Sequence, residues 1–210
     1  MSDADVAALL LVRVILGIVM IAHGLNHWRG GGRIEGTARW FTGLGLRKGT
    51  LQAWMSVVTE VGAGALLIAG LLTPLACAAV ISVMLVAGVL AHRPNGFFVF
   101  KEGYEYVLVL AVVSLALAVL GPGRLSADHV GDIEVTGWSG GAIALGAAVA
   151  ATAGLLGVFW RPAPKSIEPV SIEPESTDTE STEPKPTEPK PTDTTEAPAV
   201  PGPPAEQETR

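Results

Sequence analysis

Cysteine is almost absent from this chain of 210 residues, because Cys77 is the single example. One cysteine excludes a disulfide framework, a paired-cysteine redox site, a thiolate iron–sulfur site and a cysteine-rich zinc site. Charge is also scarce: 16% of the residues are charged, whereas a typical soluble domain has about 25%. The shortage of charge is unusual for a soluble domain.

The negative charge is concentrated at the C-terminal end. Residues 166–210 hold 11 acidic and three basic residues, whereas the chain as a whole has a net charge of −6. The remainder is therefore mildly basic, but it has no clustered basic face, so no nucleic-acid partner is expected. Pro, Thr and Glu dominate residues 166–210, and such a segment cannot bury a core. We predict a disordered acidic tail, which serves either as a solvated tether or as a docking site for a cytoplasmic partner.

Long apolar runs fill most of the rest of the chain. A helix needs about 20 mostly apolar residues to cross a bilayer core. The N-terminus lacks the positive region and the cleavage site of a signal peptide, so the first run is interpreted as a retained helix. The sequence therefore predicts an all-α, polytopic membrane helix bundle. Its helices are expected at residues 6–27, 51–72, 75–92, 105–120 and 139–160.

Basic residues in the connections predict the orientation of the bundle. Lys and Arg favour the cytoplasmic side of a membrane. Nine of them fall on one side, and Arg124 is alone on the other. The N-terminus is therefore expected outside and the tail inside. The nine are Arg29, Arg33, Arg39, Arg47, Lys48, Arg93, Lys101, Arg161 and Lys165.

The first basic connection also contains apolar and aromatic residues. We interpret Thr37 to Leu44 as a short segment at the membrane interface, with Trp40 and Phe41 at the level of the lipid headgroups.

A few ionisable residues fall within the predicted spans or at their ends. Such residues are costly in a membrane unless they are paired, so each one is a functional hypothesis. We expect most of them to form a polar cluster in the cytoplasmic half of the bundle. The candidates are Arg13, His23, His27, Glu60, His92 and Glu105.

Helix geometry suggests a partner for Arg13. Counted from the cytoplasmic ends of their helices, Glu60 lies roughly 13 Å deep and Arg13 roughly 21 Å deep, at about 1.5 Å per residue. A long arginine side chain can cover the difference of about 8 Å. The sequence thus predicts a buried Arg13–Glu60 ion pair, whose role could be purely structural.

Several ligands suit such a cluster. Three histidines with carboxylates could bind a metal, and His23 facing His92 could ligate haem, but the spacing is diagnostic of neither. His23 and His27 could also be simple interfacial residues. No cofactor motif is evident, and a quinone head bound by His and Glu near the interface would fit proton-coupled redox chemistry.

An ordered set of short motifs resembles a known family. It comprises Arg13 with Gly17, a helix end with His23 and His27, the segment from Glu60 to Pro74, AHRPNGFF at 91–98, Glu105 and GPGRLSAD at 121–128. Together these are similar to the DoxX-like family of small bacterial membrane proteins, over about Leu10 to Asp128.

The resemblance implies a four-helix core over residues 1–128 in the bacterial inner membrane. Residues 129–165 then add an outer loop and a fifth helix, and 166–210 form the tail. The family takes its name from a subunit of a thiosulfate:quinone oxidoreductase, and some relatives are linked to complexes with sulfurtransferase and superoxide dismutase. The implied function is an accessory or quinone-contacting subunit of a redox complex. A small-solute transporter and a scaffold that recruits proteins through the tail are the alternatives.

Overall fold

The computed structural model describes residues 1–162, and within this range the chain is helical and contains no strand. The predicted tail and Lys165 lie outside the described residues. The helices are α1 (Asp3–Arg29), α2 (Arg33–Gly43), α3 (Gly49–Ala69), α4 (Thr73–Ala87), α5 (Glu105–Leu120), α6 (Ala127–Val130) and α7 (Gly137–Phe159). α4 continues through the π-helical turn η1 (Gly88–His92) and the 3₁₀ turn η2 (Arg93–Asn95), and η3 (Val99–Lys101) precedes α5.

The predicted membrane bundle is confirmed. In the described part of the chain, α1, α3, α4 with its continuation, and α7 are long and apolar enough to cross a membrane. The fifth apolar helix, α5, has 16 residues and is shorter. All five predicted spans are thus helices whose bounds lie within a few residues of those expected.

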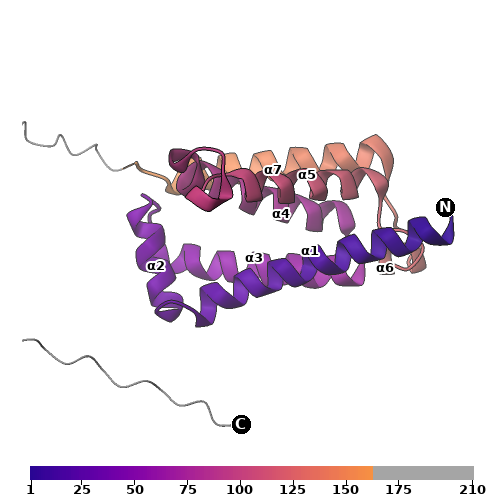
Figure 1. Cartoon of the computed structure of the whole chain (residues 1–210), viewed down its shortest axis with the longest axis horizontal. Coiled ribbons are helices and arrows are strands. Elements are labelled where there is room, and N and C mark those ends of the chain that lie inside the picture. Colours follow the sequence, from indigo (N-terminus) through magenta and orange to yellow (C-terminus); the bar gives the residue numbers. More distant parts are fainter. Residues whose placement is uncertain (163–210) are drawn as a thin grey trace, which may run out of the picture. The chain divides into compact units, whose positions relative to one another are not determined.

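The helices run alongside one another in two groups (Figure 1). α1 packs against α3, while α4 packs against both α5 and α7 and also contacts α3. α2 lies across one end of the bundle, which we call the α2 end and which also holds the connection from α4 to α5. The opposite end, the α6 end, holds the N-terminus and α6.

Close packing of α1 on α3 depends on small residues. A Cβ atom added to Gly17 would lie 2.6 Å from the carbonyl oxygen of Gly64, and one added to Gly64 would lie 2.5 Å from that of Gly17. Both distances are too short for a real contact, so only glycines permit this approach of the two backbones.

At the α6 end, Asp128 caps a helix that is distant in sequence. Its carboxylate accepts hydrogen bonds from the backbone N–H groups of Leu72 (2.7 Å) and Thr73 (2.9 Å) and from the Thr73 hydroxyl (2.7 Å). These N–H groups begin α4, where a negative charge is favourable. Asp128 is 1% exposed, so the segment after α5 is fastened into the bundle.

At the α2 end, the end of α7 is tied to the segment between α2 and α3. Arg47 N–H donates to the Phe159 carbonyl and Arg161 N–H donates to the Gly45 carbonyl, both at 2.8 Å. The indole Nε1 of Trp160 donates to the Leu44 carbonyl at 3.2 Å. α7 is therefore an integral wall of the bundle.

Candidate functional site

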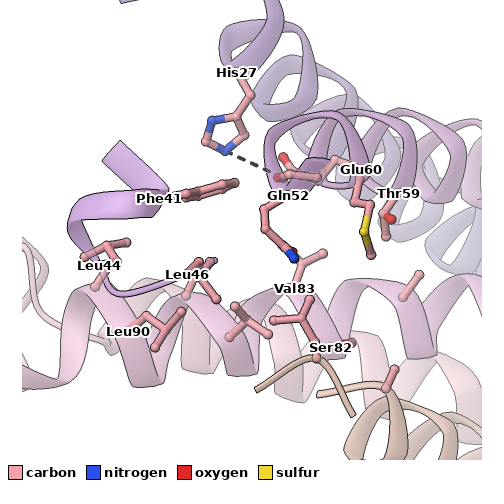
Figure 2. Close-up of a pocket in the computed structure, with 18 of the residues that line it drawn as sticks. His27, Phe41, Leu44, Leu46, Gln52, Thr59, Glu60, Ser82, Val83 and Leu90 are labelled. Atoms are coloured by element: carbon pink, nitrogen blue, oxygen red, sulfur yellow. Dashed lines mark hydrogen bonds and ion pairs between the residues drawn. The ribbon is translucent and has the colours of Figure 1, made fainter. Parts of the chain in front are cut away.

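Four helices enclose a cavity of about 480 Å³ near the α2 end. The walls come from α2, α3, α4 and α7, together with His27 of α1, and they are mainly apolar (Figure 2). Small residues of α4 and α7, such as Ala79 and Ala151, leave the space open. Trp40 and Met55 line the cavity and are 48% and 40% exposed, so it opens to the surface of the bundle.

A polar pair borders this cavity, with Glu60 buried and His27 partly exposed. Nε2 of His27 lies 3.6 Å from Oε1 of Glu60, and Glu60 is 2% exposed. The Ser56 hydroxyl, one turn earlier on α3, donates a hydrogen bond to the same Glu60 oxygen. Gly24 makes the arrangement possible, because a Cβ there would lie 3.1 Å from the Cβ of Glu60.

α2 covers the polar pair with aromatic side chains. The ring of His27 lies 6.0 Å from that of Trp40 and 5.7 Å from that of Phe41, measured between centroids. The Thr37 hydroxyl donates to the His27 carbonyl at 2.8 Å and fixes α2 to the end of α1. The predicted interfacial segment is thus a longer helix, and it also forms a wall of the cavity.

Gln52 and Ser56 are site residues that the sequence analysis missed. Gln52 lines the cavity, is 3% exposed, and its Nε2 has no hydrogen-bond partner among residues 1–162. The signal was present, because residues 52, 56 and 60 are polar and recur at four-residue spacing. That spacing places them along one face of a helix.

The predicted Arg13–Glu60 ion pair is wrong. Glu60 lies beside Gly24, which is roughly 16 Å along α1 from Arg13 at about 1.5 Å per residue. Arg13 is instead fully buried toward the α6 end, where its Nη2 donates to the Leu125 carbonyl at 2.5 Å. The prediction compared the depths of Arg13 and Glu60, counted from assumed ends of their spans. It could not anticipate that a group after α5 would lie closer to Arg13.

The structure also separates the remaining candidates. The ring of His23 stacks with that of Tyr106 of α5 at 6.2 Å between centroids. His92 Nδ1 lies 2.7 Å from the Glu102 carbonyl oxygen. Glu105 accepts a hydrogen bond from the Val99 N–H at 3.0 Å. Of the six candidates, His27 and Glu60 are the two in direct contact, and no group of three or more metal-ligating side chains occurs in residues 1–162.

The site therefore combines the hydrogen-bonding groups of His27, Glu60 and Gln52 with a mainly apolar cavity. Such a combination is typical of sites for small, largely apolar molecules, in which a few polar groups set the orientation of the ligand. A carboxyl group and an imidazole in contact can also exchange a proton with a ligand.

Comparison with known proteins agrees with this architecture. The DoxX family model matches residues 8–93, from α1 to the end of α4 and its continuation. The curated protein named "Putative oxidoreductase CatD" of Bacillus subtilis (strain 168) is 30% identical over 108 residues, which are 51% of this chain and 76% of that relative. No solved structure matches the chain significantly. With its long apolar helices, the chain is a multi-pass membrane protein that belongs to the DoxX family.

Proposed function

We propose that this protein is a quinone-contacting accessory subunit of a membrane-associated redox complex that handles thiol stress. The observation that carries the proposal is the contact of His27 with the buried Glu60 beside a mainly apolar cavity of about 480 Å³. That volume lies within the range of about 300–1,000 Å³ that is usual for sites of small ligands.

The cavity suits the chemistry of a quinone head. A quinone ring is flat and apolar, and its carbonyl oxygens need hydrogen-bond donors. Trp40 and Phe41 provide flat apolar surface, and His27 or a protonated Glu60 provides a donor. Because exposed side chains line part of the cavity, an apolar quinone tail can leave toward the lipid.

The role of the polar pair is then to hold and move protons. Reduction of a quinone to a quinol consumes two electrons and two protons. Glu60 and His27 supply or accept a proton at the carbonyl oxygen, and Ser56 orients Glu60 by its hydrogen bond. The electrons come from a partner protein, in keeping with an accessory subunit. The name of the Bacillus relative, which contains the word oxidoreductase, supports this class of reaction.

The proposal includes an orientation in the bacterial inner membrane. The α2 end carries most basic residues of the described chain, including Arg33, Arg39, Arg47 and Arg93. Arg124 at the α6 end is paired with Asp3 at 2.8 Å. The positive-inside rule then places the α2 end, and with it the quinone site, toward the cytoplasm.

Binding of a short-tailed quinone analogue to the purified full chain tests the proposal. Trp40 lines the cavity, so saturable quenching of tryptophan emission is expected, and Trp40→Phe should remove the largest part of it. The complex itself is tested by isolating the protein from native membranes in mild detergent, where a sulfurtransferase or superoxide dismutase should accompany it. A protein that shows no saturable quenching and is isolated alone contradicts the proposal.

A further inference from the structure

Of the motif AHRPNGFF at residues 91–98, only Ala91 lines the cavity described above. Its polar residues hold a tight turn, in which Asn95 Nδ2 donates to the carbonyls of Ala91 and Glu102, both at 3.3 Å. Arg93 follows the π-helical turn and is exposed. Within residues 1–162, no carboxylate oxygen lies within 4 Å of its guanidinium. The charge of Arg93 is thus available to a ligand.

A second groove ends at Arg93. It has a volume of about 350 Å³, lies between α4 and α5, and shares no lining residue with the cavity that contains Glu60. Val89 and Leu108 line it and are 37% and 46% exposed, so the groove faces the lipid. Gly88 leaves its floor open, because a Cβ there would meet only Val107, at 3.6 Å.

The level of the groove in the membrane follows from the next residues. Phe97, Phe98 and Phe100 are 44%, 51% and 75% exposed, and their rings form a chain of contacts. Tyr104 contacts Phe97, is 37% exposed and has the amphipathic kind of ring that lies at the level of the lipid headgroups. Arg93 and Tyr104, at the end of the groove, therefore lie where the phosphate groups of lipids are found.

We propose that this groove binds an anionic phospholipid, with one acyl chain between α4 and α5 and the phosphate on Arg93. The apolar walls match an acyl chain, and the Arg93 guanidinium, which has no carboxylate partner among residues 1–162, matches a phosphate. Free phosphate would leave the apolar walls uncovered, and a zwitterionic lipid lacks net charge to attract Arg93. The occupant is thus one lipid with a negatively charged headgroup, and this assignment is independent of the quinone site.

Native mass spectrometry of the full chain in mild detergent tests the lipid site. Phosphatidylglycerol is titrated in, with phosphatidylcholine and inorganic phosphate as the other probes. One phosphatidylglycerol should be retained more tightly than phosphatidylcholine. Arg93→Gln should weaken its retention about fivefold, since a basic residue near a lipid surface is worth about 1 kcal/mol. The matched control is Arg47→Gln, which removes the same charge from an exposed residue at the same end of the bundle.

A second variant tests the acyl chain separately. Gly88 has φ −58°, so leucine fits the backbone there and its side chain fills the groove. Gly88→Leu should lower phosphatidylglycerol retention while the melting temperature shows that the bundle remains folded. Equal retention by Arg93→Gln and Arg47→Gln, equal retention of the two lipids, or unchanged binding to Gly88→Leu would overturn the proposal. Binding of phosphate alone with the same affinity would do so too.

Discussion

The two ends of the bundle bury ionisable groups in different ways. At the α6 end, Asp128 receives three hydrogen bonds and lies in tightly packed surroundings. At the α2 end, Glu60 contacts Ser56 and His27, and the cavity lies next to it. The difference shows that burial of a charge alone does not mark a ligand site. A ligand site is indicated where an open space adjoins the buried group and few hydrogen bonds from the protein already occupy that group.

Arg13 lies in the same packed part of the molecule, although its Nε and Nη1 have no hydrogen-bond partner among residues 1–162. It is fully buried, donates to the Leu125 carbonyl, and lies close enough to Asp128 to be attracted by its charge. Its guanidinium also fills the space beside Gly70, where a Cβ atom would clash. The group holds the segment after α5 against the ends of α3 and α1. The sequence made Arg13 a site candidate, but its surroundings favour a structural role.

The largest effect is expected from Asp128→Ala. Three hydrogen bonds to a carboxylate are lost and two N–H groups at the start of α4 lose their cap, so the free energy of unfolding should fall by about 3 kcal/mol. Thermal unfolding in detergent measures the change. Asp3→Ala, which breaks the exposed pair with Arg124, should change it little. Equal destabilisation by the two variants would show that the α6 end is not fastened by Asp128.

Glu60→Gln should affect binding rather than stability. The amide can still accept the Ser56 hydrogen bond, but it cannot carry a negative charge or release a proton. Affinity for a quinol analogue should fall about tenfold, because a quinol hydroxyl donates a charge-assisted hydrogen bond to the carboxylate and only an ordinary one to the amide, while the melting temperature is unchanged or higher. Glu35→Gln on the exposed face of α2 is the matched control. If Glu60→Gln lowers the melting temperature and leaves binding of the analogue intact, Glu60 has a structural role like that of Asp128 and the two ends do not differ.

A smaller effect should follow from filling the cavity through α7. Ala151 and Ala153 are both exposed on α7, but Ala151 lines the cavity and Ala153 does not. Ala151→Phe should weaken binding of the quinone analogue about fivefold by occupying part of the volume. Ala153→Phe should leave it unchanged. If the two variants bind equally well, the ligand does not enter this cavity.

Orientation can be tested with single cysteines introduced at the two ends. The single native cysteine, Cys77, is buried, so introduced cysteines report on their own position. In intact cells, a membrane-impermeant maleimide should label Gly131→Cys near α6 and leave Gly43→Cys at the end of α2 unlabelled until the cells are opened. The reverse pattern would place the quinone site outside.

Local sequence patterns predicted the helices to within a few residues because apolar length sets the spans. The break between α3 and α4 lies at residues 70–72, and Thr73 and Pro74, the expected break, instead begin α4. The partners of the buried charges were harder to predict. Arg13 donates to the Leu125 carbonyl 112 positions away, and only the return of the chain after α5 brings them together. Gln52 and Ser56 could have been found from their spacing with Glu60. That a cavity lies beside them depends on how α2, α4 and α7 pack, which helical periodicity does not specify.

Photoaffinity labelling shows directly whether a quinone analogue enters the cavity beside Glu60. A quinone analogue with a photoreactive group is bound to the full chain, irradiated, and the modified residues are mapped by mass spectrometry. Labels are expected on the cavity wall, at Trp40, Phe41 or Met55. An unreactive analogue should displace them, and Ala151→Phe should lower their yield. Labels confined to residues that do not line the cavity, or labels unaffected by the competitor, would contradict the proposed quinone site.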